Sequence, residues 1–161
     1  MRGPGLAENL HLSGSRQLLL DTNCLIFFLS GKEPYLSALL PLFRRVQRGE
    51  ATIFVSTVTE AELLVRPERE GNRDAMQRVQ DLLSEDGFYV INVERRIARR
   101  AAAIRGHFMR AGGDKKLPIA DAIIIATAIE TGCDAIVGND AAWRGKTEIP
   151  FVYLEEAITN Q

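Results

Sequence analysis

Residues 18–23 read Leu-Leu-Leu-Asp-Thr-Asn, a short apolar run that leads directly into polar residues. A short continuous apolar run bounded by polar residues is typical of a strand that is buried on both faces. Four more runs of this kind follow along the chain, at residues 52–55, 88–93, 135–137 and 151–154. The sequence therefore predicts five buried strands, the first of them at residues 18–20.

Amphipathic stretches with apolar residues at helical spacing separate these runs. The predicted helices cover residues 35–48, 58–66, 72–85, 94–111 and 118–131, whereas residues 66–71 and 111–116 are polar enough to be exposed loops. Strands that alternate with helices are typical of a parallel sheet covered by helices. We therefore expect the α/β fold class.

The length and composition of the chain indicate one domain. The chain has 161 residues, 46% of them hydrophobic, which is enough for one well-buried core and too few for two ordinary domains. We expect this domain at residues 17–161, after a loose leader or expression remnant at residues 1–16. No apolar run reaches the ~20 residues that span a bilayer. Two distant cysteines, Cys24 and Cys133, match no metal or redox spacing, which fits a cytoplasmic protein with buried thiols.

Two of the predicted strands end in an acidic residue where a binding site is expected. In open α/β sheets, ligands bind beyond the carboxyl ends of the strands. Asp21 follows the first strand directly, and Asp140 follows the fourth strand after Gly138 and Asn139. Either aspartate alone could be a turn or helix-capping residue. The prediction of a site therefore depends on the acids in the helices.

Two glutamates follow the second strand, and they have different explanations. Glu60 would complete a capping box with Thr57, which explains it without a function. Glu62 is in register with Val65, which predicts that its carboxylate lies on the face that packs against the sheet. A salt bridge from Glu62 to Arg66, four residues on, is the structural alternative to a bound metal.

The strongest single indication of a site is Asp121, which lies in an apolar helix at residues 117–128. Its side chain shares a helix face with Ile125. An unpaired buried carboxylate is costly and usually becomes protonated or binds a cation. Pairing with Lys115 or Lys116 is the structural alternative.

If the acids at the strand ends and in the helices converge, four carboxylates share one small volume. These are the carboxylates of Asp21, Glu62, Asp121 and Asp140. They would repel one another at neutral pH, and a divalent cation would relieve this repulsion. Carboxylate oxygens suit Mg²⁺ or Mn²⁺, and the sequence has no Cys/His cluster for zinc. Such a site suits phosphodiester hydrolysis, because a metal lowers the pKa of bound water and stabilises transition-state charge.

Four segments of the chain resemble, in order, the motifs of the PIN-domain family, and particularly its VapC-type toxin ribonucleases. The segments are residues 20–23, 59–63, 117–122 and 137–143, and the match extends over roughly residues 17–154. The resemblance implies a five-stranded parallel sheet between helices. It also implies an endoribonuclease with Mg²⁺ or Mn²⁺ bound by Asp21, Glu62, Asp121 and Asp140, and with Asn23 and Asn139 in support.

The last of these segments departs from the family pattern at two positions. Gly138 stands where Thr or Ser is usual, and Trp143 stands where Phe is usual. The family also varies between Asp and Asn at neighbouring positions here. Either Asp140 or Asn139 could therefore be the fourth ligand.

Local basic patches must hold RNA, because the 20 basic and 21 acidic side chains nearly cancel. Lys115 and Lys116 precede the helix that carries Asp121, and we expect them to contribute to RNA affinity. The arginine-rich helix at residues 94–111 is better explained as a solvated helix face.

The family resemblance also implies a homodimer and a small antitoxin that covers the acidic groove. Two alternatives stay open: a nuclease directed at DNA or at nucleic acid structure, and a PIN-fold binding or scaffold protein without turnover. A phosphatase of the haloacid dehalogenase class is disfavoured, because it needs a second aspartate where Asn23 stands.

Overall fold

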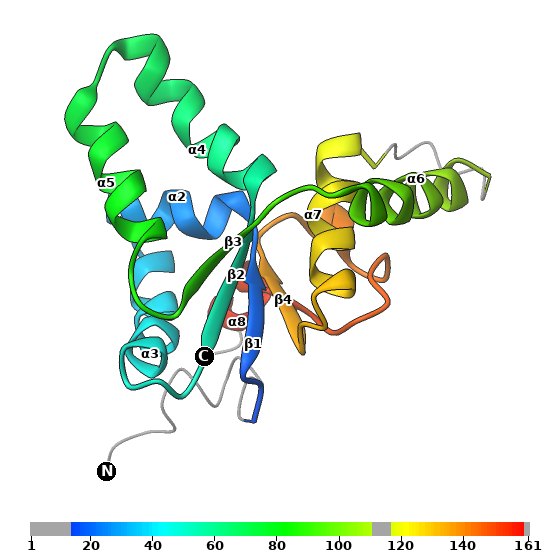
Figure 1. The fold of residues 1–161 in the computed structure, drawn as a ribbon. Helices are drawn as coiled ribbons and strands as arrows, with labels where there is room; N and C mark the ends of the chain where they lie inside the picture. The colour runs from blue at the N-terminus through cyan, green and yellow to red at the C-terminus, as the bar shows by residue number, and fades with distance from the viewer. Residues whose placement is uncertain (1–13, 111–116, 160–161) are drawn as a thin grey trace.

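The computed structural model describes residues 14–110 and 117–159 (Figure 1). Its five strands form one parallel sheet in the order β3-β2-β1-β4-β5. The strands are β1 (Gln17–Leu20), β2 (Thr52–Ser56), β3 (Phe88–Ile91), β4 (Ala135–Gly138) and β5 (Phe151–Tyr153). The predicted α/β class and five-stranded parallel sheet are confirmed, and β1 lies at the centre of the sheet.

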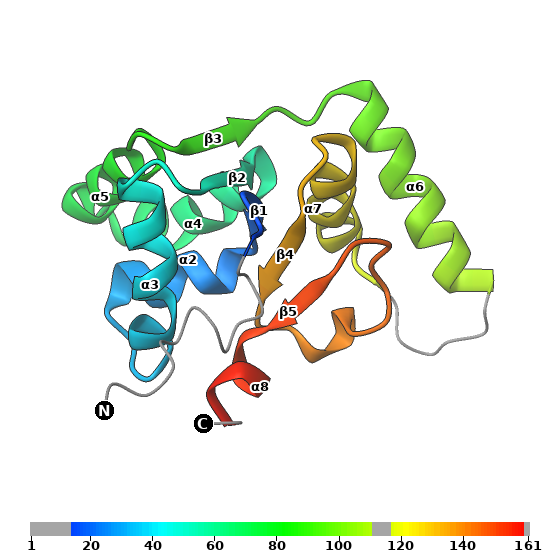
Figure 2. The same ribbon diagram turned by 90° about the horizontal axis from the view of Figure 1, so that it is seen from below.

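Helices cover both faces of the sheet (Figure 2). The described part of the chain has α2 (Thr22–Ser30), α3 (Tyr35–Gln47), α4 (Thr57–Glu70), α5 (Arg73–Leu83), α6 (Arg95–Arg110), α7 (Ile119–Glu130), α8 (Leu154–Thr159) and the short 3₁₀ helix η1 (Ala141–Trp143). Helices α2 and α8 were not predicted from the sequence, and the fifth strand was predicted to extend into Leu154, the first residue of α8.

The central strand divides the interior into two hydrophobic clusters. Leu18 and Leu20 point into a cluster with α2, α3, α5 and α8, whereas Leu19 points into a cluster with α6 and α7. This alternation follows from the two-residue period of a strand, and all three side chains are fully buried. The three buried positions of β1 must therefore all be apolar, whichever face of the sheet they point to.

Helix α4 is longer than the sequence indicated. It runs through Pro67 to Glu70, so the loop expected at residues 66–71 is wrong. Its N-cap is Ser56, and not Thr57 as the sequence had indicated. The hydroxyl of Ser56 accepts a hydrogen bond from the N–H of Val58. A salt bridge four residues apart, from Arg66 to Glu70 at 2.9 Å, supports the last turn.

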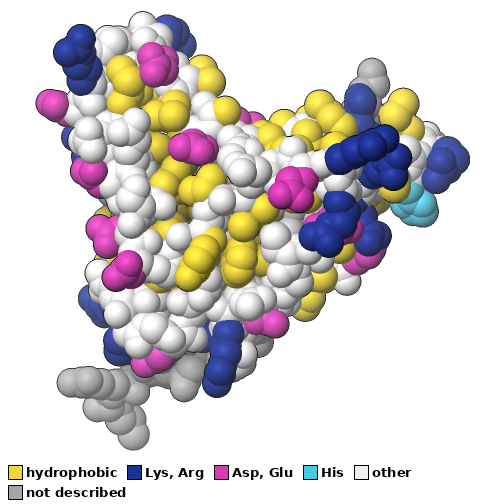
Figure 3. All heavy atoms as spheres, in the orientation of Figure 1, with side chains coloured by type: hydrophobic (Ala, Val, Ile, Leu, Met, Phe, Trp, Pro, Cys, Tyr) yellow, Lys and Arg dark blue, Asp and Glu magenta, His cyan; other side chains and the backbone are white. Residues whose placement is uncertain are grey.

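The two groups of helices diverge beyond the carboxyl ends of the strands, which gives the molecule a V-shaped outline (Figures 1 and 3). Helices α4 and α5 form one arm, and α6 and α7 form the other. None of the described helices is both long and apolar enough to cross a membrane. Most of the expected leader and the expected loop at 111–116 lie outside the described residues.

Candidate active site

A pocket of about 390 Å³ lies beyond the carboxyl ends of β1 and β4, and all four predicted acids line it. Two of the acids follow strands, and the other two project from α4 and α7. The rest of the lining comprises Thr22, Asn23, Ile26, Val65, Ile124 and Trp143. The structure thus brings together the carboxylates that the sequence predicted to converge.

Asp21 is the most buried of the four acids, with 3% of its surface exposed. It is the N-cap of α2, and its Oδ1 accepts the N–H of Cys24 at 2.9 Å. Its Oδ2 accepts the N–H of Asn139 at 3.0 Å. Burial raises the pKa of Asp21, and the negative charge of Asp140 raises it further. The hydrogen bonds from the N–H groups of Cys24 and Asn139 lower this pKa. The carboxylate is therefore fixed in position and poorly solvated.

The glycine at position 138 has a physical explanation in this arrangement. Leu20 pairs with Val137 across the sheet, which places Asp21 beside Gly138. A Cβ atom on Gly138 would lie 2.8 Å from Oδ2 of Asp21 and 2.9 Å from Cε2 of Phe151. The position therefore has no room for Thr or Ser while Asp21 keeps its present place.

We expect Gly138→Ala to destabilise the protein by ~1–3 kcal/mol, because an added methyl group forces the surrounding side chains to shift. Urea unfolding would measure this change. The matched control is Gly106→Ala in α6, whose Cβ would meet only an atom of Arg110, at 3.8 Å. That change is expected to be neutral, or stabilising by up to about 1 kcal/mol. Equal effects of the two substitutions would contradict the packing argument.

Glu62 reaches the pocket in a different way from the one predicted. The face of α4 that packs inward carries Thr59 and Leu63, whereas Glu62 is exposed and Val65 is 64% exposed. The prediction that Glu62 lies on the packed face is therefore wrong. Its Oε2 accepts a hydrogen bond from the hydroxyl of Thr22.

The alternative salt bridge of Glu62 does not form, since Arg66 pairs with Glu70 instead. The hydroxyl of Thr22 also lies 3.3 Å from that of Thr59. Thr22, which follows Asp21 directly, thus joins the start of α2 to α4 and holds the Glu62 carboxylate over the pocket.

Asp121 is half-buried at the start of α7, and its helix face is apolar as predicted. Its Oδ2 accepts a hydrogen bond from Nε1 of Trp143 at 3.2 Å. Burial raises the pKa of Asp121, and the charges of Asp140 and Glu62 raise it further. The Trp143 hydrogen bond and the positive charge of Lys146 act in the opposite direction.

Asp140 and Asn139 differ in where their side chains lie. Asp140 lines the pocket and caps η1, with Oδ1 accepting the N–H of Ala142 at 2.8 Å. The Oδ1 of Asn139 accepts the N–H of Glu155 at the start of α8, at 2.9 Å. Asn139 supports the site through its backbone N–H to Asp21, and its amide is used elsewhere. The geometry favours Asp140 as the fourth acid of the pocket.

Comparisons with known proteins agree with this geometry. A family model described as "PIN domain" matches residues 18–147. The chain belongs to the PIN domain family. The family expected from the sequence is therefore confirmed. A search of curated proteins gives no match.

Several solved structures share the fold of this PIN domain. VapBC2 of Rickettsia felis, bound to a promoter DNA fragment, is 18% identical, with a TM-score of 0.66 over 84% of this chain and 96% of that one. A toxin–antitoxin complex of Klebsiella pneumoniae is 28% identical, with a TM-score of 0.60, and the match covers 80% of this chain and 91% of that one. VapC20 of Mycobacterium tuberculosis, named as a sarcin–ricin loop cleaving toxin, is 13% identical, with a TM-score of 0.59. The match covers 80% of this chain and 93% of that one. The PIN-like fold is thus that of VapC toxins.

The acids of this PIN domain fit a divalent cation by their chemistry. Carboxylate oxygens are the ligands that Mg²⁺ and Mn²⁺ prefer. Among residues 14–110 and 117–159, no three Asp, Glu, His or Cys side chains are already arranged to hold a metal ion. Each acid is instead held by its own hydrogen-bond donor: Cys24 and Asn139 for Asp21, Thr22 for Glu62, Trp143 for Asp121 and Ala142 for Asp140.

The predictions made for the basic residues fare differently. Lys115 and Lys116 lie outside the described residues. The helix rich in arginine is only in part a solvated face, because Arg96 and Arg100 bind Glu130 of α7 at 2.8 and 2.7 Å. Thr22 and Trp143 had no role predicted from the sequence. No local pattern marks them, since each acts through a residue that is distant along the chain.

The metal-free protein is expected to gain stability from Asp21 and Asp121 as the pH falls from neutral towards their unfolded-state pKa of 3.8. The pKa values of Asp21 and Asp121 are raised by burial, so folding favours their protonated forms. That stability is fully present below the unfolded pKa and is lost as the pH rises through the raised folded pKa. Carboxyls with lowered pKa values act in the opposite direction, but only once the pH falls below their unfolded-state values of 4.5 for Glu50 and Glu70 and 3.8 for Asp134.

Thermal unfolding in EDTA across this pH range would measure the effect. Asp121→Asn removes one of the two carboxyls with a raised pKa, so the melting temperature of this variant should depend less on pH. A wild-type melting temperature that rises with pH would contradict the prediction.

Proposed function

We propose that this PIN domain is a Mg²⁺- or Mn²⁺-dependent endoribonuclease that hydrolyses RNA phosphodiesters, and that it is the toxin of a toxin–antitoxin pair. The observation that supports this most is the convergence of Asp21, Glu62, Asp121 and Asp140 on one pocket. Their charges act on one another, and the positive charge of Lys146 lowers the pKa of Asp121. An excess of negative charge in a pocket is a binding site for a cation.

Each acid has a defined part in this proposal. Asp21, fixed by two N–H groups, and Asp121, fixed by the Trp143 indole, are the rigid ligands. Glu62 and Asp140 complete the set from opposite sides, from α4 and from the end of β4. A bound divalent ion would lower the pKa of a water molecule and stabilise charge on the phosphate. The carboxylates place the ion and orient the water, and exposed Asn23 lies at the rim of the pocket.

The structural neighbours support the choice of RNA and of an antitoxin. The Klebsiella pneumoniae structure is a toxin–antitoxin complex, and VapC20 is named as a toxin that cleaves the sarcin–ricin loop. We propose by analogy that a small antitoxin covers the acidic pocket, that the toxin is a homodimer, and that it acts in the cytoplasm.

The test is incubation of the purified protein with labelled single-stranded RNA, structured RNA and DNA of matching sequence, each with Mg²⁺, Mn²⁺ or EDTA. We expect RNA to be cleaved only when a metal is present, and DNA to stay intact. Cleavage of DNA would support the DNA-directed alternative. Metal binding without cleavage of any substrate would support a binding or scaffold protein.

The partner proposal has a separate test. A short open reading frame next to the gene would encode the antitoxin, and co-expression should yield a complex in which RNA cleavage is inhibited. Light scattering on the chain alone would report whether it is a dimer. A monomer, or a neighbouring protein without effect on cleavage, would overturn the corresponding part of the proposal.

A further inference from the structure

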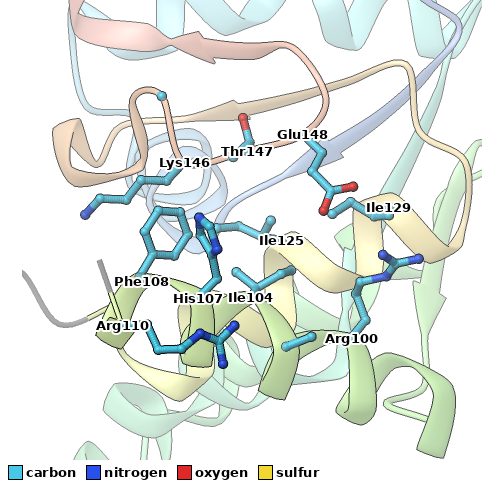
Figure 4. A pocket seen from close by; sticks show the side chains of 12 residues that line it. Arg100, Ile104, His107, Phe108, Arg110, Ile125, Ile129, Lys146, Thr147 and Glu148 are labelled. Atoms are coloured by element: carbon cyan, nitrogen blue, oxygen red, sulfur yellow. The ribbon is translucent and has the colours of Figure 1, made fainter. Parts of the chain in front are cut away.

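A second pocket, of about 450 Å³, lies between α6, α7 and the loop that follows Trp143 (Figure 4). It shares α7 with the acidic pocket, because Ile124 lines the acidic pocket and Ile125 lines this one. Of its residues, only Lys146 has entered the argument so far, through the effect of its charge on Asp121. The helices contribute apolar side chains together with Arg100, His107 and Arg110, and the loop after Trp143 contributes Lys146 and Glu148.

The basic side chains of this pocket are not all available to a ligand. Arg100 is engaged by the carboxylate of Glu130, which it shares with Arg96, and its Nε lies 2.7 Å from Oε1. Arg110 is exposed and forms no ion pair within the described residues. Figure 4 shows Arg100 and Glu148 toward one end of the pocket, and Lys146 and Arg110 toward the other with Phe108 between them. The end at Lys146 and Arg110 is therefore the end that favours an anion.

Lys146 is the residue of this pocket whose charged group is not satisfied by the described part of the chain. Its Nζ is buried and has no hydrogen-bond partner in the part of the chain that the structure describes. An ammonium group has three donors, and a buried charge without acceptors is unfavourable. Its contact with the Phe108 ring, 5.6 Å from Nζ to the centroid, offsets only part of this. Within residues 14–110 and 117–159, no hydrogen bond would have to break for Lys146 to turn toward an incoming anion.

The pocket is also linked to the acidic site. Trp143, three residues before Lys146, donates its hydrogen bond to Asp121. Lys146 is close enough to Asp121 for its charge to act on that carboxylate. An RNA strand that enters the acidic pocket must overcome the repulsion of four carboxylates. Cations beside that pocket would hold phosphates on either side of the reacting linkage.

We propose that this second pocket binds a nucleotide of the RNA substrate that flanks the cleaved linkage. Lys146 contacts its phosphate, Arg110 adds positive charge on the other side of Phe108, and the apolar wall formed by Ile104, Phe108 and Ile125 takes the sugar and base. The volume and the combination of an apolar wall with a basic end suit a nucleotide better than a bare phosphate. This inference rests on the proposed function, because it assumes an RNA substrate.

The test measures RNA binding without cleavage, as the fluorescence anisotropy of a labelled single strand in EDTA over a range of salt. Lys146→Met keeps the length of the side chain and removes its charge. We expect affinity to fall about fivefold at low salt, and the slope of log affinity against log salt to lose about 0.7. Lys146→Arg should retain the wild-type slope. Removal of a buried unpaired charge should leave the melting temperature equal or higher.

The matched control is Lys32→Met, which removes an exposed lysine in the turn after α2 that lies over the rings of Phe27 and Tyr35. It should leave RNA affinity unchanged. A Lys146→Met variant with wild-type affinity and slope would overturn the inference, and so would equal effects of the two substitutions. Titration with inorganic phosphate separates the ligand sources: phosphate binding that depends on Lys146, without any effect on RNA, would also overturn it.

These outcomes distinguish the two proposals. If the wild type cleaves RNA with Mg²⁺ and Lys146→Met binds RNA equally well, the nucleotide pocket is wrong and the nuclease stands. If the wild type binds no RNA at any salt concentration, both proposals fall.

Discussion

Asp121→Asn is expected to slow metal-dependent RNA cleavage by about 10³-fold while the protein stays folded. The amide has the same shape as the carboxylate, so the buried start of α7 keeps its packing and Trp143 keeps an acceptor for its Nε1–H. The charge that would hold the cation is lost. The same change removes repulsion with Asp140 and Glu62, so the metal-free variant should melt at a higher temperature than the wild type.

Cleavage rates with enzyme in excess, and thermal unfolding in EDTA, would measure these two effects. The matched control is Asp134→Asn, an aspartate that lies before β4 and outside both pockets. Its Oδ2 accepts the N–H groups of Arg16 and Gln17, each at 2.8 Å, which lowers its pKa. That variant should lose stability and keep activity, the reverse pattern. Wild-type cleavage by Asp121→Asn would mean that Asp121 is not a ligand or that the activity comes from a contaminant.

The fold was predictable because strand and helix periods are strong where both faces of the sheet are covered. β1 was identified from three leucines, and the structure buries each of them fully. Helix α2 was missed because residues 24–29 are all apolar, without the polar positions that mark a helical period. Its start was hidden too, since Asp21 is both the end of a strand and the N-cap of this helix.

The membership of the site was predictable, whereas its internal geometry was not. Strand ends and one helix face place three of the acids without knowledge of tertiary contacts. Glu62 was assigned to the wrong face, because α4 has apolar residues on more than one side and packing selects Thr59 and Leu63. The space beside Gly138 depends on Asp21, which follows β1, and on Phe151 of β5. Contacts of this kind leave no local pattern in the sequence.

Trp143→Phe is expected to weaken Mn²⁺ binding by about 10- to 100-fold, the usual effect of losing a hydrogen bond that orients a metal ligand. Trp143 is 2% exposed, and its indole is the donor that fixes Oδ2 of Asp121. Phenylalanine keeps most of the buried ring and removes the donor. Asp121 would then keep its charge and lose its fixed orientation. Calorimetric titration with Mn²⁺ would measure the affinity.

Two comparisons separate this orienting role from simple packing. Trp143→Ala should cost ~3–5 kcal/mol of stability, whereas Trp143→Phe should cost far less, so a loss of affinity in the phenylalanine variant cannot come from unfolding. Trp143 is also the only tryptophan in the chain, and its fluorescence reports on Asp121 directly. Mn²⁺ should change that fluorescence in the wild type and not in Asp121→Asn. If Trp143→Phe binds Mn²⁺ as tightly as the wild type, the indole only fills space, and Asp121 is positioned by α7 alone.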